Sequence, residues 1–220
     1  MALTRMFDGV FRIDGRLATR NLTPGVRVYG EELKVVDGAE YRLWNPYRSK
    51  LAAALLNGMK TMAIKPGAEV LYLGAANGTT CSHVSDIVGG EGSVYCVEIS
   101  KRSMHDLLGL CDTRENMLPI FADARNVEEY GGDVDVADVL YQDVSAQEQA
   151  DILLKNAALL ESNGMAYVAI KSQSIDISKK PELVFKEFID RVSGEFKVLE
   201  RIQLEPFDRM HLFVVFQKKG

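Results

Sequence analysis

Cysteine and histidine are scarce in this chain of 220 residues, which contains three of each. The cysteines, Cys81, Cys96 and Cys111, are odd in number and include no C-x-x-C pair. We therefore expect buried small side chains in a reducing compartment, not a disulfide framework or a redox centre. The histidines are scattered along the sequence and predict no zinc site, so we expect no bound metal.

Long apolar runs are also missing. No stretch approaches the roughly eighteen consecutive apolar residues that predict a membrane-spanning helix, and the first ten residues lack the apolar core of a signal peptide. We expect no membrane segment and a cytoplasmic location. The length is enough for one α/β core with a small appendage, and the sequence contains no internal repeat.

The net charge is −5, and it is unevenly distributed. Residues 1–60 contain ten Lys and Arg against six Asp and Glu, a balance of +4, whereas the remaining 160 residues have a balance of −9. Phosphate binding usually needs a basic surface, so an acidic body would hold a nucleic acid poorly by itself. Any nucleic-acid substrate should therefore be delivered by partners.

The first 47 residues predict a small β appendage. Short β-like runs are separated by Asp-Gly pairs typical of hairpin turns, at residues 8–9, 14–15 and 37–38. Hairpins of this size lack a stable core of their own. We expect residues 1–47 to pack on a main domain of residues 48–220. After a break at Asn45-Pro46, a helical pattern extends to about residue 62.

From residue 67 onward, strands and helices alternate, which predicts a parallel sheet with helices on both faces. Strands are expected at residues 69–73, 93–98, 117–120, 136–142 and 165–171, and helices near 80–88, 102–113, 148–160 and 181–191. Two final strand-like runs, 196–204 and 211–217, predict an antiparallel hairpin. A mostly parallel seven-stranded sheet that ends this way suits the Rossmann-like fold of S-adenosylmethionine methyltransferases.

The strongest local signal is the loop after the first of these strands, in the sequence EVLYLGAANGTT. The strand leads into the small residues Gly74, Ala76 and Gly78, and a helix begins near Thr79 and Thr80. Ligands of open α/β sheets bind at the carboxyl ends of the strands, where such a loop lets the backbone approach them. The nicotinamide fingerprint needs glycine at position 79, so the spacing fits an adenosylmethionine site better. A tight turn without a ligand is the alternative.

Two acidic residues follow the next two strands. Glu98 ends the second strand, where its carboxylate can accept hydrogen bonds from both ribose hydroxyls of a nucleoside. Asp123 follows the third strand, within reach of an adenine amino group. Each has a simpler alternative, a solvated strand end for Glu98 and a turn cap for Asp123. Together with the glycine loop, they favour an adenosine-containing ligand.

Four more polar residues lie near predicted strand ends or helix starts: Lys50, Asp143, Lys171 and His211. A ribose hydroxyl is a weak acid, so its oxygen needs a base or electrostatic help to act as a nucleophile. A lysine in a desolvated site can serve as that base if an aspartate orients it. A second lysine and a histidine could hold the ribose and phosphate. Alternatively, Lys171 extends to solvent.

The motifs taken together resemble the fibrillarin family, in its archaeal form without a glycine-arginine-rich tail. They are, in order, WNPYRSKLAAALLNG, VLYLGAANGTTCSHVSDIVG, VYCVEIS, ADAR, YQDVSAQEQ, VAIKSQSID and LEPFDRMH. The resemblance covers nearly the whole chain. It implies methylation of ribose 2′-oxygens in rRNA and tRNA, with S-adenosyl-L-methionine as the cofactor. It also implies three partners: a Nop-domain scaffold protein, a kink-turn-binding ribosomal-type protein and a C/D-box guide RNA that pairs with the target.

The resemblance also assigns site residues. The family's catalytic Lys-Asp-Lys-His set falls on Lys50, Asp143, Lys171 and His211. Its cofactor positions fall on Thr79, Thr80, Glu98, Ile99, Asp123, Ala124, Asp143, Val144, Ser145 and Ala146.

One segment departs from the family pattern. The family usually reads D-V-A-Q-P where this chain reads D-V-S-A-Q, so Ala146 replaces a glutamine and Gln147 lies one residue later. Two alternatives to an RNA methyltransferase stay open. One is a methyltransferase that acts on a small molecule or a protein, and the other is a structural subunit with a vestigial cofactor site.

Overall fold

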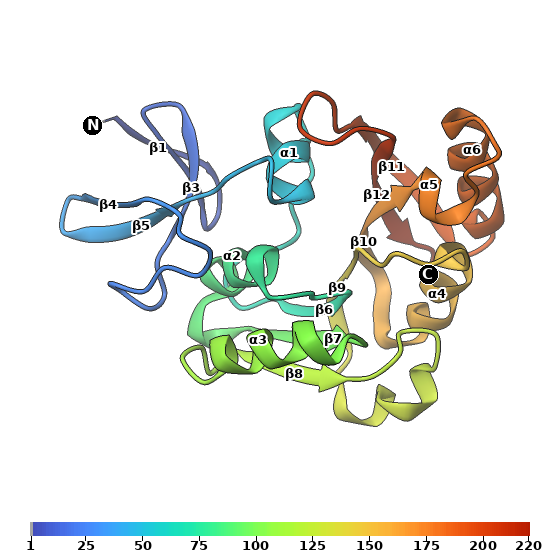
Figure 1. Ribbon diagram of the computed structural model, residues 1–220, viewed down its shortest axis with the longest axis horizontal. Helices are drawn as coiled ribbons and strands as arrows, with labels where there is room; N and C mark the ends of the chain where they lie inside the picture. The colour runs from blue at the N-terminus through green and yellow to red at the C-terminus, as the bar shows by residue number, and fades with distance from the viewer. Residues whose placement is uncertain (1) are drawn as a thin grey trace.

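The computed structural model describes residues 2–220, which form two β-sheets and the helices around them (Figure 1). A five-stranded antiparallel sheet has the order β1-β2-β3-β5-β4, and a seven-stranded sheet has the order β11-β12-β10-β9-β6-β7-β8. In the larger sheet, β12 is antiparallel to both of its neighbours and the other strand pairs are parallel. This mixed architecture confirms the predicted Rossmann-like fold.

The small sheet is larger than the expected hairpins. Its strands are β1 (Leu3–Phe7), β2 (Val10–Ile13), β3 (Arg16–Arg20), β4 (Leu33–Val36) and β5 (Ala39–Leu43). The predicted turns are present. Asp14 and Gly15 have φ of 49° and 83°, and Asp37 and Gly38 have φ of 51° and 78°. Two successive left-handed residues are what a tight hairpin turn requires, and Asp-Gly tolerates them well.

All seven strands predicted for the larger sheet are present. They are β6 (Glu69–Leu73), β7 (Ser93–Glu98), β8 (Met117–Phe121), β9 (Ala137–Gln142), β10 (Leu160–Lys171), β11 (Phe196–Gln203) and β12 (His211–Lys218). The largest difference concerns β10, which begins five residues earlier than expected. Its pairing with β9 shifts between Leu160 and Met165, and the left-handed φ of 64° at Asn163 lies within that irregular stretch.

The helices follow the predicted order, with corrections to their lengths. They are α1 (Lys50–Leu56), α2 (Thr79–Val88), α3 (Lys101–Cys111), α4 (Gln149–Asn156), α5 (Ser172–Ile175) and α6 (Pro181–Val192). The prediction that the first helix extends to residue 62 is wrong, because the chain turns at Asn57 and at Gly58, whose φ is 94°. Helix α4 is also shorter than expected, since a 3-10 turn (Ala157–Leu159) follows it. The sequence did not predict α5.

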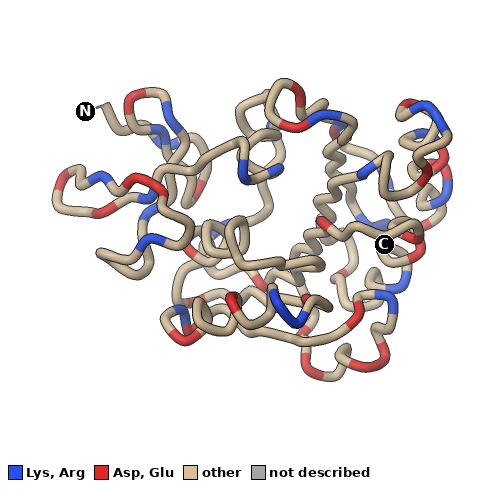
Figure 2. Tube along the Cα trace, viewed as in Figure 1, with Lys and Arg blue, Asp and Glu red and all other residues tan. Residues whose placement is uncertain are grey.

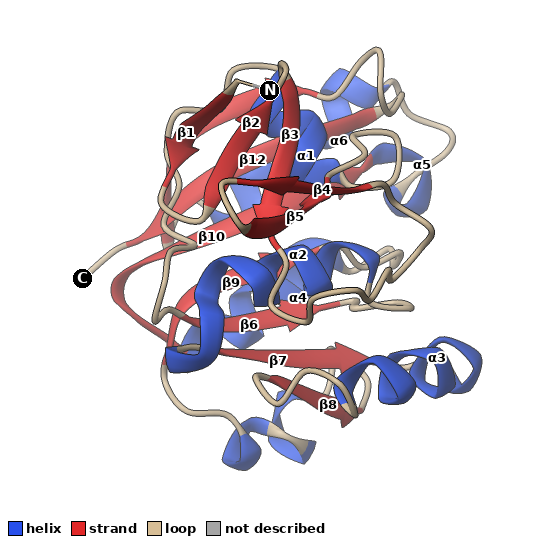
Figure 3. Cartoon of the chain, turned by 90° about the vertical axis from the view of Figure 1, so that its left-hand side faces the viewer, coloured by secondary structure: helices blue, strands red, loops and turns tan. Residues whose placement is uncertain are grey.

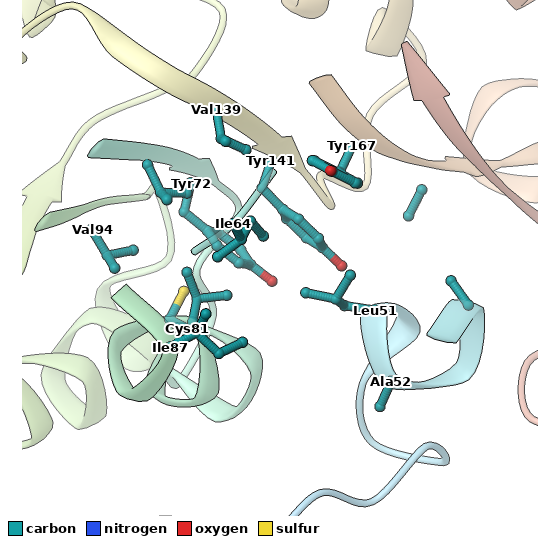
Figure 4. Close-up of a cluster of buried hydrophobic side chains, with 14 of the residues drawn as sticks. Leu51, Ala52, Ile64, Tyr72, Cys81, Ile87, Val94, Val139, Tyr141 and Tyr167 are labelled. Carbon is teal, nitrogen blue, oxygen red and sulfur yellow. The ribbon is translucent and has the colours of Figure 1, made fainter. Parts of the chain in front are cut away.

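Helices cover both faces of the larger sheet. Buried side chains of α1, α2 and α3 pack with one face, and those of α4 and α6 pack with the other. Figure 4 shows the first of these layers, where Leu51 of α1 lies close to Tyr141 of β9 and Tyr72 of β6. The rings of Tyr72 and Tyr141 stack with their centroids 4.4 Å apart. Helix α1 is therefore fixed against the strands whose ends form the site described below.

A buried network of charges joins the small sheet to α2, which lies next to it in Figure 3. Arg42 of β5 forms ion pairs with Glu31 at 2.5 Å and with Asp86 of α2 at 2.9 Å. Arg114 forms a further ion pair with Asp86 at 2.7 Å. All four side chains are at most 1% exposed. Two positive and two negative charges balance, which is what allows them to be buried together.

His83 of α2 lies within this interface and is fully buried. Its Nδ1 lies 2.8 Å from the Thr19 hydroxyl, and its Nε2 lies 2.8 Å from the Tyr29 hydroxyl. Thr19 donates its own proton to Asp86, so it accepts from Nδ1–H. Burial, followed by the charges of Arg42 and Arg114, lowers the pKa of His83 well below its usual value. The imidazole is therefore neutral.

The charge is distributed unevenly in space as well as in sequence. In Figure 2, basic and acidic positions are interspersed along the small sheet, basic positions lie near α1, and acidic positions gather in the turns between β8 and β9. Among the helices of residues 2–220, none combines the length and the apolar character needed to cross a membrane.

Candidate active site

A cavity of about 860 Å³ opens at the carboxyl ends of β6, β7, β9 and β10. This is the edge where open α/β sheets bind ligands, and the volume is typical of small-molecule sites. Most of the predicted cofactor residues line it: Gly74, Ala76, Thr79, Thr80, Glu98, Ile99, Asp123, Ala124, Asp143, Val144, Ser145 and Ala146. Of the four residues predicted to be catalytic, Lys50, Asp143 and Lys171 line it as well.

Two glycines of the loop after β6 have different environments. Gly74 has a φ of 82°, and a Cβ at this position would lie 2.9 Å from the carbonyl oxygen of Asp143. Gly78, which is not among the lining residues, begins α2 with a φ of 84°, and a Cβ there would lie 2.5 Å from a methyl group of Leu110. Gly74 thus lets two loops of the cavity approach each other, and Gly78 lets α2 pack against α3.

Glu98 holds the cavity wall together. Its Oε2 accepts a hydrogen bond of 2.8 Å from the backbone N–H of Ala76, and its Oε1 accepts one of 2.7 Å from Ser100. The side chain is only 7% exposed. The carboxylate therefore ties the loop after β6 to the loop after β7 and faces the cavity from a fixed position.

Asp123 lines the cavity and also caps a turn, so both interpretations of its role survive. Its Oδ1 accepts from the backbone N–H of Arg125 at 3.0 Å, and the Arg125 guanidinium contacts both carboxylate oxygens at 2.7 to 3.0 Å. These hydrogen bonds with the Arg125 side chain are the main reason that the pKa of Asp123 lies below its usual value. Asp123 is therefore a fixed anion at the cavity wall.

Asp143 lies between the two lysines. It follows the end of β9, and its Oδ1 is 3.1 Å from Nζ of Lys50 and 2.8 Å from Nζ of Lys171. Lys50 is the first residue of α1, which Ser49 caps by accepting from the backbone N–H of Ala52 at 3.3 Å. Three distant segments of the sequence thus meet at one carboxylate.

Lys171 ends β10 and is strongly hydrogen-bonded. Besides the Asp143 carboxylate, its Nζ contacts the Asp143 carbonyl oxygen at 2.8 Å and the Ser145 hydroxyl at 3.0 Å. An ammonium group has three donors, and three acceptors surround it here. Ser145 occupies the position where the family usually has alanine, so one of these contacts results from the departure noted in the sequence. Both Ala146 and Gln147 of that segment line the cavity.

His211 lies beside the cavity and is not among its lining residues. It begins β12 and pairs directly with Lys171 across the antiparallel β10–β12 ladder, so the two side chains project from the same face. Its Nδ1 is 2.8 Å from Oδ1 of Asp208, whose Oδ2 is 3.8 Å from Nζ of Lys50. The sequence interpretation missed Asp208. Its position three residues before His211 was visible, but its proximity to Lys50 depends on the tertiary structure.

Two tyrosines, Tyr72 and Tyr141, lie in the buried layer between the sheet and helices α1 and α2 (Figure 4). Burial, with contributions that include the negative charge of Asp143, raises the pKa of Tyr72 and of Tyr141 well above the usual value. Both hydroxyls therefore stay protonated and do not compete as bases. Tyr47 and Arg48 also line the cavity, and Tyr47 is 67% exposed. The sequence interpretation quoted both within a motif and gave them no role.

Comparison with known proteins decides the family. The fibrillarin family model matches residues 2–220. The chain belongs to the fibrillarin family. The fibrillarin-like rRNA/tRNA 2′-O-methyltransferase of Pyrococcus furiosus is 49% identical over 218 residues, which cover 96% of each protein.

Two solved structures of the family are similar to this chain throughout. The fibrillarin of Aeropyrum pernix, solved with natively bound S-adenosyl-L-methionine, is 44% identical with a TM-score of 0.90, and the match covers 98% of each chain. The fibrillarin of a fibrillarin/Nop5p complex is 37% identical with a TM-score of 0.89, over 99% of this chain and 100% of that one.

The residues around the cavity suit S-adenosylmethionine. The carboxylate of Glu98 suits a ligand with ribose hydroxyls, and Gly74 leaves space for close backbone packing. Within residues 2–220, no group of three or more His, Cys, Asp or Glu side chains is arranged to hold a metal ion.

Proposed function

We propose that this protein transfers a methyl group from S-adenosyl-L-methionine to the ribose 2′-oxygen of rRNA and tRNA, within a ribonucleoprotein particle. The observation that carries this proposal is the Asp143 carboxylate, which lies within 3.1 Å of Nζ of both Lys50 and Lys171. This arrangement is placed at the wall of a cavity suited to an adenosine cofactor, in a chain whose relatives carry the name of this activity.

The proposed cofactor contacts follow the cavity wall. Glu98 accepts from the ribose hydroxyls, and Asp123 and Ala124 lie on the side of the adenine. The segment that contains Thr79 and Thr80, together with residues 143–146, holds the remainder. S-adenosylmethionine, when bound, supplies an electrophilic methyl carbon on a positively charged sulfur.

The proposed chemistry begins at Lys171. Asp143 orients Lys171, which assists the loss of the proton of the 2′-hydroxyl, and Lys50 and His211 hold the ribose and its phosphate. With the cofactor bound, the 2′-oxygen would form a bond to its methyl carbon as the carbon–sulfur bond breaks and the thioether leaves. The Lys171 ammonium would stabilise the negative charge that develops on the oxygen, while the hydroxyl proton passes to solvent. Since three acceptors now surround Lys171, one of them must give way to the ribose hydroxyl. Much of the acceleration should come from positioning.

We propose that partner molecules, and not this chain, select the nucleotide that is methylated. A Nop-domain scaffold, which a fibrillarin of 37% identity binds as Nop5p, would anchor the chain beside a kink-turn-binding protein and a C/D-box guide RNA. The guide would choose the nucleotide by base pairing, so the acidic body needs little RNA affinity of its own. We propose the cytoplasm as its location, residues 48–220 as the methyltransferase domain and residues 1–47 as its appendage.

The deciding experiment measures methyl transfer from labelled cofactor to a target RNA. The complete mixture contains guide RNA and both partner proteins, and a parallel mixture contains this chain and the target alone. A target with a 2′-deoxynucleotide at the guided position is the matched control. We expect label only in the complete mixture and only with the ribose target. Label that is independent of the guide, or label on a protein or small molecule, would contradict the proposal. Absence of cofactor binding would instead favour a vestigial subunit.

A further inference from the structure

We propose that Asp208 is a positioning residue of this site, which orders His211 and Lys50 in the way that Asp143 orders Lys50 and Lys171. This inference rests on the proposed function, because it concerns the same reaction. It adds a second carboxylate to the four residues that the family resemblance assigns.

Asp208 lies on the loop between β11 and β12, and contacts from other segments fix that loop. Its backbone N–H donates to the carbonyl of Leu204 at 3.1 Å. The side-chain amide of Asn57, just after α1, donates to the carbonyls of Gln203 at 2.6 Å and Glu205 at 2.8 Å. The neighbouring ring of Phe207 contacts that of Tyr47 edge-on, with centroids 5.1 Å apart. The loop therefore holds its carboxylate at a defined position relative to α1.

Positive groups surround the Asp208 carboxylate. His211 Nδ1 lies at 2.8 Å and Lys50 Nζ at 3.8 Å, and the aspartate side chain is 32% exposed. Burial alone raises the pKa of Asp208, but the hydrogen bond with His211 and the charges of His211, Lys50 and Lys171 outweigh it and lower the pKa below its usual value. The carboxylate is thus ionised at neutral pH.

The protons of His211 follow from its neighbours. Nδ1 lies 2.7 Å from the carbonyl oxygen of Arg209 and 2.8 Å from the Asp208 carboxylate, and both are acceptors. Nδ1 must therefore carry a hydrogen, so Nε2 is the atom left for a substrate. Among the described residues, no group hydrogen-bonds to Nε2.

The two carboxylates link the site residues into one chain of contacts. In order, it runs His211, Asp208, Lys50, Asp143, Lys171, with successive separations of 2.8, 3.8, 3.1 and 2.8 Å. Lys50 is shared by both carboxylates. Without Asp208, Lys50 would have one anionic partner and His211 none. Each carboxylate therefore sets the geometry of two nitrogen-bearing side chains, and Lys50, at the start of α1, belongs to both pairs.

The test compares Asp208→Asn with wild type in the complete RNA-guided reaction. Asparagine keeps the shape and loses the charge. We expect kcat to fall about 10- to 100-fold, as supporting residues of catalytic groups typically show. The KM for RNA and the Kd for cofactor should stay within about twofold. Asp208→Glu should recover part of the rate. Asp112→Asn, on an exposed carboxylate after α3, is the matched control and should behave as wild type.

A second readout uses the chain alone, without RNA or partners. Crystal structures of wild type and of Asp208→Asn are compared at His211 and Lys50. We expect the His211 ring and the Lys50 Nζ to leave their positions, because the carboxylate that both contact has lost its charge. A residue that only supports the loop would leave both side chains in place when asparagine preserves the fold.

The outcomes separate this inference from the proposed function. An unchanged kcat, or unchanged positions of His211 and Lys50 in folded Asp208→Asn, would overturn the role of Asp208. Failure of the wild-type chain to methylate guided RNA would overturn the proposed function, while the positions of the two side chains in Asp208→Asn would still test the role of Asp208. If Asp208→Asn unfolds, Asp208→Glu replaces it: a reduced kcat with a displaced His211 or Lys50 would support positioning, and wild-type kcat and positions would overturn it.

Discussion

Lys171 and His211 lie directly opposite each other in the antiparallel β10–β12 ladder, although forty residues separate them in sequence. Their proximity follows from the final hairpin, which adds β12 against the parallel part of the sheet. Cross-strand partners share a face, so the ladder places both side chains on the side of the cavity. In a purely parallel sheet, without this final hairpin, Lys171 would have no residue of β12 opposite it.

Lys171→Ala should reduce methyl transfer by about 10²- to 10⁴-fold, because it removes the group that assists proton loss. Cofactor affinity should change little, since Glu98 and the loop of residues 74–80 stay intact. Single-turnover assays and calorimetric titration of cofactor measure the two quantities. Lys186→Ala, an exposed lysine of α6 paired with Asp190, is the control. Normal turnover by Lys171→Ala would exclude the assigned role.

Ser145→Ala restores the residue usual for the family and removes one of three acceptors around Lys171. The hydrogen bond is neutral on the serine side and exposed, so the effect on kcat should be small, within about fivefold. We expect a larger effect from Asp143→Asn, which removes the charge shared by two lysines. The ratio of kcat values for the two variants is the measurement. If Ser145→Ala costs as much as Asp143→Asn, the carboxylate is not the dominant partner of Lys171.

Gly74→Ala should weaken both the fold and cofactor binding. The added Cβ would lie 2.9 Å from a backbone carbonyl at a φ of 82°, so backbone must shift. Strain of this kind costs about 1–3 kcal/mol, which lowers Tm by several degrees in a domain of this size. Gly109→Ala in α3, where the added Cβ meets nothing within 4 Å, is the contrasting variant. It should raise Tm slightly, because alanine favours the helix. Equal Tm changes would contradict this account.

Stability should fall as the pH decreases from 7.5 to 5.5. His83 has a folded pKa well below its usual value because it is buried near two arginines, whereas in the unfolded chain it binds a proton near pH 6.5. The unfolded state therefore binds more protons in this window, and the free energy of unfolding decreases with acidity by up to about 1.4 kcal/mol per pH unit. Urea unfolding at several pH values measures the slope.

The matched comparison uses two histidine variants. His83→Gln should flatten this slope, and His105→Gln, on the exposed face of α3, should leave it unchanged. A wild-type slope that persists in His83→Gln would show that another group controls acid sensitivity.

Patterning in the sequence predicted the larger sheet because each strand there is an apolar run bounded by turn residues. The local loop signal likewise identified Gly74 and Glu98 as neighbours in one cavity. The first helix was overextended because Met59 continues the helical period of Leu51 and Leu55, while the turn at Gly58 is a local backbone event that periodicity does not report.

Asp208 and the pairing of the small sheet escaped prediction for another reason. Both depend on contacts between segments far apart in the chain. The lysine at position 50 meets Asp208 only because α1 packs beside the β11–β12 loop. Arg42 looks like an ordinary strand arginine, yet it is fully buried by carboxylates from two other segments. Asp208 and Asp86 lie within motifs of the sequence, but their partners come from distant segments, so the motifs do not report the pairing.

The charge cluster around Asp86 fixes the small sheet to α2. Tilting the sheet away from α2 would separate Arg42 from Asp86, and both charges are buried where they lie. None of the five strands of this sheet lines the cavity, whose lining begins at Tyr47 among the described residues. The appendage therefore supports α2 from behind and does not cover the entrance, so access to the site requires no movement of the small sheet.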